Sequence, residues 1–586
     1  MKELKHLNKY FYKYRFRLIS GIFITIIARI FLLFTPELIG SSIDVIAEWQ
    51  KGEITDIAVV RRELILNILY IVGAAIVAGA FTFLMRQTII NVSRYIEYDL
   101  KNEVYQQYQK LSQSFYKANR TGDLMNRISE DVGKVREYAG PAIMYSINTL
   151  TLFVIALILM FNQAPKLTLY TIIPLPILSY FIYILSKSIH KKSTIVQEWL
   201  SKLSTFTQES FSGISIIKSY GMTAKVSDDF SVLSNENRDK NIDLVKVQAL
   251  FFPLMILLIG LSNIIVIYIG GTQYINGEIE SIGVIAKFII YVNMLTWPVA
   301  TVGWVTSVVQ RAEASQKRIN EFLKQEPEIK NLVPNPTPLS GDIEFKNVKF
   351  TYSDTNITAL NSISFKVNKG ETLAILGKTG SGKSTILDLI GRLYDTQEGE
   401  VLIDNTPIRD IHLKSLREDI GYVPQDAFLF SESIRNNIKF GKVEATDEEM
   451  IASAKNADVH KNIVDFKKGY DTVLGERGIT LSGGQKQRVS IARAIIKKPK
   501  ILLFDDCLSA VDTETEEKIL KNLQGITAEK TTIIVSHRIS SVKNADKIIV
   551  LDSGEILQEG SHETLVNTEG YYKELFLKQL TEKEIS

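Results

Sequence analysis

The sequence predicts a multidomain protein in which an all-α domain of six transmembrane helices precedes an α/β domain built around a phosphate-binding loop. Long apolar stretches are concentrated before about residue 310, and the rest of the chain alternates short apolar runs with glycine and charged residues. The chain of 586 residues is also too long for one compact core. We therefore expect a transmembrane domain at 1–325, a linker at 326–341 and an α/β domain at 342–586.

The overall composition excludes two classes of protein. The 68 basic and 65 acidic residues leave a net charge of only +3, so we expect no nucleic acid partner bound through a broad basic face. The single cysteine, Cys507, excludes an internal disulfide framework and is typical of a reducing compartment. The basic N-terminus lacks the short apolar core and cleavage site of a signal peptide, so we expect the first span to insert directly.

Six apolar stretches are long enough to cross a hydrocarbon layer of roughly 30 Å. They lie near residues 18–39, 64–85, 139–161, 167–185, 249–270 and 282–308. One such stretch could be a buried helix of a soluble protein, but six of them predict a multi-pass membrane protein in contact with lipid.

The charges between the spans predict the orientation of the chain. Lysine and arginine are dense in the N-terminal segment and in the long segments 86–136 and 187–246, whereas the loops after the third and fifth spans have almost none. By the positive-inside rule, the N-terminus and both long segments are cytoplasmic. The first loop is an exception because it contains Lys51, Arg61 and Arg62. An even number of spans also places the α/β domain in the cytoplasm, so we expect the cytoplasmic (inner) membrane.

Three residues inside the spans are unusual. Arg29 lies in the first span, where it either faces cargo or an internal carboxylate, or reaches the interface because the span protrudes further than expected. Pro174 and Pro176 are expected to interrupt the backbone hydrogen bonds of the fourth span and to kink it.

A glycine-rich stretch predicts a site for ATP and Mg²⁺. In Gly-Lys-Thr-Gly-Ser-Gly-Lys-Ser at 377–384, the glycines allow backbone N–H groups to face phosphates, and a lysine reaches the β and γ phosphates. The hydroxyl of Ser384 is a ligand for Mg²⁺. A helix beginning at Lys383 adds its N-terminal dipole. The expected ATP-binding residues are Gly377, Lys378, Thr379, Gly380, Ser381, Gly382, Lys383, Ser384 and Thr385.

Two further segments follow the phosphate loop. Leu-Ser-Gly-Gly-Gln at 481–485 opens a helix whose first residues offer a hydroxyl and backbone N–H groups to a phosphate. The expected contacts are Ser482, Gly483, Gly484 and Gln485. The apolar strand at 501–504 then ends at Asp505, which is placed to hold Mg²⁺ through water.

These three segments together resemble those of the ATP-binding-cassette (ABC) family, and the resemblance covers the whole chain. More narrowly, the chain resembles a half-transporter of the multidrug or lipid exporters with the type IV transmembrane fold. The resemblance implies an ATPase coupled to transport. It also implies a dimer with a second ABC half-transporter, because in the family the LSGGQ residues contact the ATP held by the opposite subunit.

The resemblance assigns roles to further residues. Tyr352 matches the aromatic residue that stacks on adenine, although the residues alone also allow a tyrosine at a strand end. Gln425 matches the glutamine that contacts Mg²⁺ and water, and His537 matches the histidine that contacts the γ phosphate. The implied metal ligands are Ser384, Gln425 and Asp505, and the implied catalytic residues are Asp506, His537 and Gln425.

Four motifs resemble the parts that connect the domains and the subunits. Residues 114–125 and 209–220 resemble the two coupling regions of ABC exporters, which lodge in the ATPase; the alternative is a pair of solvated hairpins. Gly-Glu-Arg-Gly at 475–478 resembles an exporter motif near the coupling helices, and residues 509–512 resemble the loop that crosses to the partner.

Asp506 departs from the family pattern, which has glutamate at this position to orient the attacking water. Removing one methylene withdraws the carboxylate by about 1.5 Å, and such a misplacement can lower turnover by about a hundredfold. One interpretation is the degenerate-site subunit of a heterodimer, with a slow site of its own and an intact LSGGQ for its partner. The other is a homodimer in which Asp506 is an adequate base.

The sequence therefore predicts ATP-driven efflux of small amphipathic compounds across a bacterial cytoplasmic membrane by alternating access. Two alternatives stay open. The first is an ATP-gated regulatory or channel-like membrane protein, in which nucleotide binding matters and hydrolysis does not. The second is a homodimeric lipid exporter.

Overall fold

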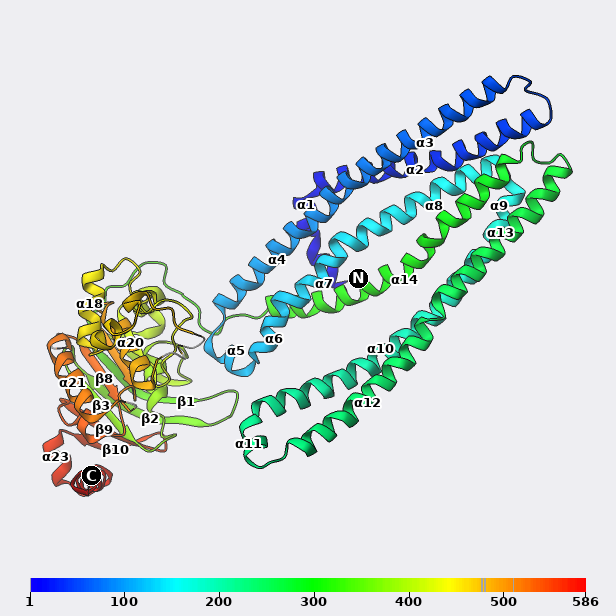
Figure 1. Ribbon diagram of the computed structural model, residues 1–586. Coiled ribbons are helices and arrows are strands. Elements are labelled where there is room, and N and C mark those ends of the chain that lie inside the picture. Colours follow the sequence, from blue (N-terminus) through cyan, green and yellow to red (C-terminus); the bar gives the residue numbers. More distant parts are fainter. Residues whose placement is uncertain (1, 476–477, 479–480, 510, 528, 586) are drawn as a thin grey trace. The chain divides into compact units, whose positions relative to one another are not determined.

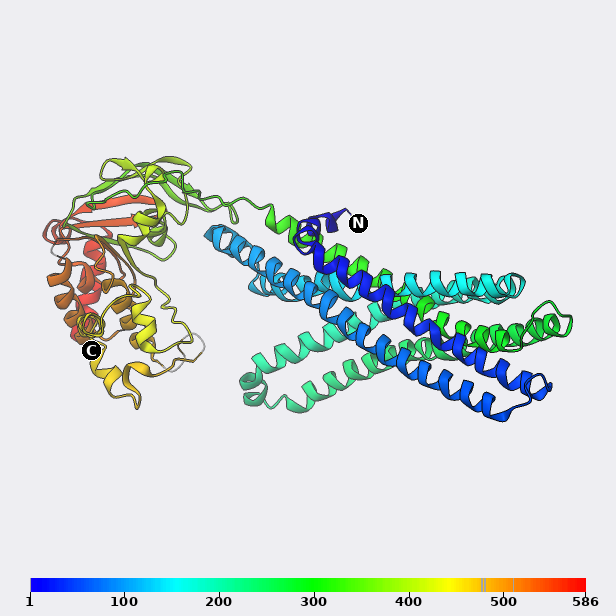
Figure 2. The ribbon, with the colours of Figure 1, turned by 90° about the horizontal axis from the view of Figure 1, so that it is seen from above.

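The computed structural model describes residues 2–475, 478, 481–509, 511–527 and 529–585. The chain forms two compact units. The first comprises Met1–Gln109 and Gly122–Gln325, and the second comprises Lys110–Thr121 and Glu326–Ser586. In the described chain every strand belongs to the second unit, and the first unit is helical (Figures 1 and 2).

Long helices make up the first unit. Their bounds are α1 Asn8–Lys13, α2 Arg15–Gln50, α3 Ile57–Met85, α4 Asn91–Lys110, α6 Thr121–Asn126, α7 Val132–Glu137, α8 Ile143–Gln163, α9 Pro165–Ile172, α10 Pro174–Ser212, α11 Ile214–Ser219, α12 Thr223–Gln248, α13 Phe251–Ile275 and α14 Gly283–Leu323. A 3₁₀ turn precedes α1, and π-helical turns at Arg86–Ile90, Arg127–Asp131 and Tyr138–Ala142 join several of these helices without breaking them. The unit therefore consists of rods far longer than a membrane is thick.

Five helical stretches in the described chain are long and apolar enough to cross a membrane, with mean hydropathies of 1.5 to 2.6. They are Arg15–Gln50, Ile57–Lys110, Thr121–Gln163, Thr223–Ile275 and Gly283–Leu323. The fourth expected span, at 167–185, is not among them because the helix is interrupted at Ile173, directly before Pro174. The expected interruption of the hydrogen bonds by proline is thus confirmed; it divides this apolar segment between α9 and α10, while Ile173 itself keeps helical dihedral angles.

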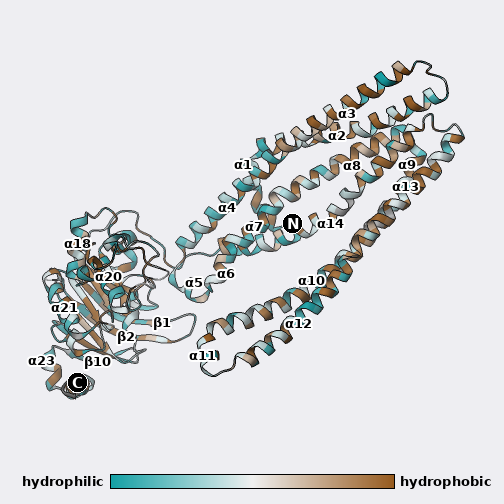
Figure 3. Cartoon of the chain, in the orientation of Figure 1, coloured by the Kyte–Doolittle hydropathy of each residue, from teal (hydrophilic) through white to brown (hydrophobic). Residues whose placement is uncertain are grey.

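The long polar segments between the spans are continuations of the membrane helices, as the sequence predicts. Figure 3 shows the change along one such rod, where the hydrophobic α13 gives way to the more hydrophilic α12. Helices α10 and α12 lie side by side and are joined at their tip by the short α11 (Figure 1). This hairpin contains the expected coupling region at 209–220, and the region at 114–125 includes α5 (Gln113–Ala118) in the second unit.

Two sheets form the second unit. An antiparallel sheet has the order β2-β1-β4-β5, and a mainly parallel sheet has the order β10-β9-β3-β8-β7-β6, in which only β10 runs antiparallel to its neighbour. The strands are β1 Ile343–Thr351, β2 Thr358–Val367, β3 Thr372–Gly377, β4 Glu398–Ile403, β5 Thr406–Pro407, β6 Ile420–Val423, β7 Ile501–Asp505, β8 Thr531–Val535, β9 Lys547–Asp552 and β10 Glu555–Gly560.

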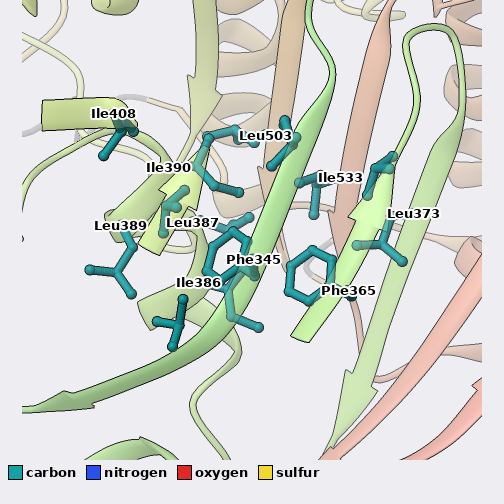
Figure 4. Close-up of a cluster of buried hydrophobic side chains, with 14 of the residues drawn as sticks. Phe345, Phe365, Leu373, Ile386, Leu387, Leu389, Ile390, Ile408, Leu503 and Ile533 are labelled. Carbon is teal, nitrogen blue, oxygen red and sulfur yellow. The ribbon is translucent and has the colours of Figure 1, made fainter. Parts of the chain in front are cut away.

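A hydrophobic core of this unit lies between the two sheets and around α15, the helix that follows β3. Figure 4 shows Phe345 and Phe365 of the antiparallel sheet facing Leu373 and Ile533 of the parallel sheet. The two phenylalanine rings stack with their centroids 4.5 Å apart. The helices of the unit after α5 are α15 Lys383–Ile390, α16 Leu413–Glu418, α17 Ile434–Lys439, α18 Asp447–Asn456, α19 His460–Val464, α20 Gly483–Ile495, α21 Thr513–Thr527, α22 Ile539–Val542, α23 His562–Asn567 and α24 Tyr571–Ile585.

The strand order determines where the polar residues of the motifs meet. Strands β3, β8, β7 and β6 are parallel neighbours, so their carboxyl ends lie at one edge of the sheet. The phosphate loop follows β3, His537 follows β8, Asp505 ends β7 and Gln425 follows β6. Segments as much as 160 residues apart are thereby brought to one site.

Candidate nucleotide site

The phosphate loop is a tight turn that requires glycine at two positions. Gly377, at the end of β3, has φ +155°, and Gly382, the N-cap of α15, has φ +101°. A Cβ on Gly377 would lie 2.1 Å from the carbonyl oxygen of Leu551, and one on Gly382 would lie 2.2 Å from that of Ala359. Only glycine fits both the backbone conformation and the space. The loop thus leads from the buried strand directly into the N-terminus of a helix, as the sequence predicts.

Lys383 points back into this loop. Its ammonium donates to the carbonyl oxygens of Gly377 at 2.8 Å and Lys378 at 2.7 Å. Burial lowers the pKa of Lys383, and the nearby carboxylates of Asp506 and Asp505 oppose this shift. The positive charge is therefore held inside the loop, where a phosphate would replace the two carbonyl groups as its partner.

Ser384 and Asp505 form the candidate Mg²⁺ site. The hydroxyl of Ser384 donates to the carboxylate of Asp505 over 3.0 Å, which places two oxygen ligands of the kind that Mg²⁺ prefers side by side. Burial raises the pKa of Asp505, and the hydrogen bond from Ser384 opposes this shift. In the described chain no group of three or more histidine, cysteine or acidic side chains could hold a metal ion. The hydroxyl and carboxylate oxygens of this pair fit Mg²⁺, which usually keeps water and phosphate oxygens among its other ligands.

Asp506 and His537 face each other beside this pair. The Asp506 carboxylate lies 3.8 Å from Nε2 of His537, and it is largely buried whereas the histidine is half exposed. Burial raises the pKa of Asp506, and His537 and Lys383 oppose this shift. Asp506 also has φ +42°, a strained conformation for a residue other than glycine, and its backbone N–H donates to Val535. The sequence gives no sign of this strain.

Tyr352 follows β1 and lies against the helix after the phosphate loop. Its hydroxyl is 3.0 Å from that of Thr385, and its ring meets Phe350 and Tyr394 edge to face. The ammonium of Lys117, from α5 in the same unit, lies 4.7 Å from the ring centroid. The structure thus places Tyr352 beside the phosphate loop. There its hydroxyl contacts the hydroxyl of Thr385, a residue that the sequence predicts to bind ATP.

Gln425 lies at the edge of the site with an exposed side chain. Its backbone carbonyl accepts a hydrogen bond from Gln487 at 3.4 Å, which connects the segment after β6 to α20. Strand β6 pairs with β7 so that Val423 lies opposite Phe504, one residue before Asp505. The end of β6 therefore places Gln425 beside the strand that ends at Asp505, with its side chain exposed.

The LSGGQ segment begins a helix, as predicted. Ser482 is the N-cap of α20, and its hydroxyl accepts a hydrogen bond from the backbone N–H of Gln485. The side chain of Gln485 in turn accepts from the N–H of Ser482 at 3.0 Å, which completes a capping box. Gly483 and Gly484 occupy the first turn, where backbone N–H groups have no acceptor within the helix. The Gln485 side chain thus stabilises the helix start, and its expected contact with ATP stays a prediction.

Parts of two motifs lie outside the described residues. These are Glu476 and Arg477 of the 475–478 motif and Ala510 of the 509–512 motif. On either side of position 510, the carbonyl oxygens of Ser509 and Val511 accept hydrogen bonds from the guanidinium of Arg538. Sequence reasoning missed Arg538 because a lone arginine after a histidine has no distinctive spacing.

Gln579 is a second residue that sequence reasoning missed. It lies on α24. Its side-chain amide is hydrogen-bonded to the backbone carbonyl of His537 and to the backbone N–H of Ile539, the residues before and after Arg538. No motif in the sequence predicts this contact, since 42 residues separate Gln579 from His537.

The first unit contains a cluster of mostly partly buried polar side chains, which we call the Glu37 cluster. The carboxylate of Glu37 on α2 is 2.8 Å from the ammonium of Lys287 on α14. It also accepts hydrogen bonds from Tyr291 at 2.6 Å and from Gln163 at 2.5 Å. The cluster ties α2, α8 and α14 together. Arg29, two turns from Glu37, has no carboxylate within 4.0 Å in the described chain, and its Nε atom is buried without a hydrogen bond.

Cys507 is buried beside the site and is not part of it. Burial raises the pKa of its thiol, so this cysteine is an inert packing residue, as its position in the sequence suggests.

Comparison with known proteins gives the same division of the chain. Residues 18–299 match the family described as ABC transporter transmembrane region, and residues 360–509 match the family described as ABC transporter. The chain is 36% identical to the multidrug resistance-like ATP-binding protein MdlA of Buchnera aphidicola subsp. Baizongia pistaciae, over 99% of both chains. It is 35% identical to the probable multidrug resistance ABC transporter ATP-binding/permease protein YheI of Bacillus subtilis (strain 168), over 98% of this chain and 97% of that one.

A solved structure also resembles the whole chain. It is that of a bacterial Atm1-family ABC exporter with ATP bound, with a TM-score of 0.79 and 25% sequence identity. The similarity covers 96% of this chain and 98% of that one.

Proposed function

Because the chain belongs to the ABC transporter family, with a transmembrane region and an ATPase domain in one multi-pass polypeptide, we propose that it exports amphipathic compounds from a bacterial cytoplasm. The observation that carries this proposal is the joining of a helical membrane unit to a phosphate-loop site with an LSGGQ helix. A transporter of this family couples ATP hydrolysis to transport, and half-transporters act as dimers. The names of both relatives above, which refer to multidrug resistance, support an amphipathic cargo.

A cavity in the membrane unit has the chemistry that such a cargo needs. It measures about 720 Å³ and lies between α8, the break between α9 and α10, and α14. Apolar side chains such as Phe153 and Val302 dominate its lining, and the polar side chains among its described lining residues are all hydroxyl groups. These hydroxyls are engaged within the protein; those of Thr149 and Thr301, for example, lie 3.1 Å apart. An apolar cavity of this size with few polar groups is typical of sites for small hydrophobic ligands.

The roles proposed for the site residues follow from their positions. ATP would lie on the phosphate loop with its γ phosphate near His537, and Tyr352 would contact the adenine. Mg²⁺ would be held by Ser384 and Asp505, with Gln425 reaching it from the end of β6. When bound, the ion would neutralise negative charge that develops on the phosphates. Asp506 would accept the hydrogen bond of the attacking water.

We further propose that the partner is a different half-transporter. Asp506 is one methylene shorter than the usual glutamate, while Ser482, Gly483 and Gly484 are intact at the start of α20. This chain would therefore complete a competent site on its partner and have a slow site of its own. A homodimer in which Asp506 is sufficient is the alternative. In either case the N-terminus and the ATPase unit are proposed to be cytoplasmic.

A two-step experiment tests the proposal. Tagged chain is first isolated from its native membrane, and the associated proteins are identified by mass spectrometry. A second half-transporter with glutamate at the position of Asp506 would support the heterodimer, and recovery of this chain alone with ordinary ATPase activity would overturn it.

The recovered complex is then placed in lipid vesicles with fluorescent amphipathic dyes or labelled lipids. ATP-dependent accumulation against a gradient is expected for an exporter, and movement that needs ATP binding without hydrolysis would instead indicate a channel. Val302→Trp, which fills the cavity, should reduce dye transport, whereas Ile256→Trp at an exposed position of α13 should not. Equal transport by both variants would contradict the assignment of the cavity to cargo.

A further inference from the structure

The C-terminal helix α24 is attached to the parallel sheet on the side of β3 and β9. Tyr572 is fully buried, and it packs in one cluster with Ile539 of α22 and with residues of β3 and β9. The hydroxyl of Tyr572 is also hydrogen-bonded to His562 at 2.7 Å. These contacts hold α24 firmly beside the segment that joins β8 to α22, which is the segment that contains His537.

From this fixed helix, Gln579 reaches the backbone around His537. Its Nε2 donates to the carbonyl oxygen of His537 at 2.8 Å, and its Oε1 accepts from the N–H of Ile539 at 2.8 Å. A primary amide is a donor and an acceptor at once, so one side chain satisfies both groups in the way that a neighbouring strand would. Glutamate could only accept, and lysine could only donate.

The neighbouring residue is held from the other side. The guanidinium of Arg538 is 2.9 Å from the carboxylate of Glu516, which is fully buried on α21, and the backbone N–H of Arg538 donates to the hydroxyl of Ser536. The short segment 536–539 is thus held at both ends and at its centre. Nε2 of His537 lies 3.8 Å from the Asp506 carboxylate. The hydrogen bond from Nε2 of Gln579 acts on the backbone carbonyl of His537, and the backbone of His537 also contacts the Asp506 carboxylate.

We propose that Gln579 is a positioning residue for ATP hydrolysis: by holding the carbonyl of His537, helix α24 sets where the histidine meets the γ phosphate. This inference rests on the role proposed above for His537. It makes the C-terminal helix, which contains none of the motifs of the family, a part of the catalytic apparatus. A purely structural role, in which Gln579 only caps the start of α22 through Ile539, is the competing explanation.

Two variants separate the explanations because each keeps one of the two hydrogen bonds. Gln579→Glu keeps the acceptor for Ile539 and loses the donor to His537, and Gln579→Lys does the reverse. Hydrolysis at the site formed by this chain's phosphate loop is measured under single-turnover conditions with the full-length transporter in lipid nanodiscs, assembled as it is in the membrane; kcat and KM below are the maximal rate constant and the half-saturating concentration for that site. For Gln579→Glu we expect kcat to fall by on the order of tenfold with little change in KM, since ATP binding does not need the histidine to be in place. Gln579→Lys should keep more of the wild-type kcat, even if its melting temperature is lower.

Two controls complete the design. Gln524→Glu makes the same chemical change at an exposed position of α21 and should leave kcat unchanged. In the double variant His537→Ala/Gln579→Glu, the second change should add no further loss of kcat, because the group that it positions is already absent.

The outcomes distinguish this inference from the function on which it rests. If His537→Ala alone leaves kcat unchanged, the role proposed for His537 fails, and the positioning role fails with it. If His537→Ala lowers kcat while Gln579→Glu does not, only the positioning role is overturned. A lower kcat for Gln579→Lys than for Gln579→Glu would also overturn it, because the cap on α22 would then be the contact that matters.

Discussion

The Glu37 cluster of the membrane unit and the acidic site of the ATPase unit contain the same kinds of groups in opposite states. In the Glu37 cluster, each oxygen of the carboxylate has a partner at 2.8 Å or less, including the ammonium of Lys287. In the ATPase unit, the ammonium of Lys383 donates to two backbone carbonyls, and the Asp506 carboxylate lies 3.8 Å from the imidazole of His537. A fully paired cluster holds helices together, whereas incompletely paired charges are available to a ligand.

The largest expected effect comes from removing the free charge of the ATPase site. Lys383→Ala should lower the ATPase rate by roughly 100- to 1,000-fold, because the ammonium that would stabilise charge on the phosphates is lost. The measurement is single-turnover hydrolysis, in the purified complex, at the site formed by this chain's phosphate loop. Lys369→Ala, at an exposed turn before β3, is the matched control and should be as active as wild type. Activity within a few-fold of wild type in Lys383→Ala would refute the assignment of the site.

Breaking the paired cluster should affect stability. In Lys287→Met, Glu37 is left partly buried without its cation, at a cost of about 2–4 kcal/mol. We expect a lower melting temperature of the full chain in detergent, followed by tryptophan fluorescence. Much of the loss should be recovered in Glu37→Gln/Lys287→Met, since no charge is then left unpaired.

A surface pair provides the control for that experiment. Lys166 and Glu278 are 2.9 Å apart but well exposed, so Lys166→Met should change the melting temperature little. Equal effects of Lys166→Met and Lys287→Met would mean that the Glu37 cluster is no more important than a surface ion pair.

Replacing Asp506 by the longer glutamate is expected to increase activity, in contrast to the changes above. Asp506→Glu should raise turnover by about tenfold or more, because the carboxylate regains the reach that the missing methylene withdraws. Asp506→Asn should lower it, since the amide cannot take a proton. Single-turnover hydrolysis at the site formed by this chain's phosphate loop is the measurement. A rate for Asp506→Glu equal to that of wild type would show that aspartate is an adequate base.

The smallest expected effect is on stability and comes from replacing Asp388, whose carboxyl group is largely buried but not paired within the described residues. This residue lies on α15, and in the described chain its carboxyl group has neither a hydrogen bond nor an ion pair; burial raises its pKa from 3.8 to about 6. As pH rises through this range, the unfolded chain ionises first, so stability falls and the full penalty is present above about pH 6. Asp388→Asn should therefore stabilise the protein by on the order of 1–2 kcal/mol near neutral pH.

The pH dependence of that stabilisation is the check. Melting temperatures of wild type and Asp388→Asn are compared at about pH 4.5 and pH 7.5, where the difference should be clearly larger at the higher pH. A difference that does not depend on pH would mean that the carboxyl is not held neutral in the folded protein.

Much of the ATPase site follows from local sequence, because its parts are short and each has its own geometry. The glycines at 377 and 382 predict the turn, and Ser482 followed by Gln485 predicts the start of a helix. The apolar run before Asp505 predicts a buried strand, and the structure contains it. The spans are equally readable, apart from the fourth, where Pro174 divides a stretch whose composition alone indicates one helix.

Other features depend on which strands become neighbours. The order β3-β8-β7-β6 differs from the order along the chain, and it alone brings His537 to Asp506. The contacts of Gln579 with the backbone of His537, and of Tyr352 with Thr385, likewise join distant segments by groups found on most protein surfaces. Such pairs have no local signal, since amides and hydroxyls bond to whatever partner packing places within reach.

The sequence by itself thus determined the division into a membrane unit and a phosphate-loop ATPase, and it predicted the residues proposed to carry the chemistry. It did so because membrane spans and phosphate loops are specified by consecutive residues. The tertiary structure alone decided which of the charged groups are paired and which are open, as in the Glu37 cluster and at Asp506. That distinction depends on distances of a few ångströms between elements far apart in the chain, and those distances are set by packing.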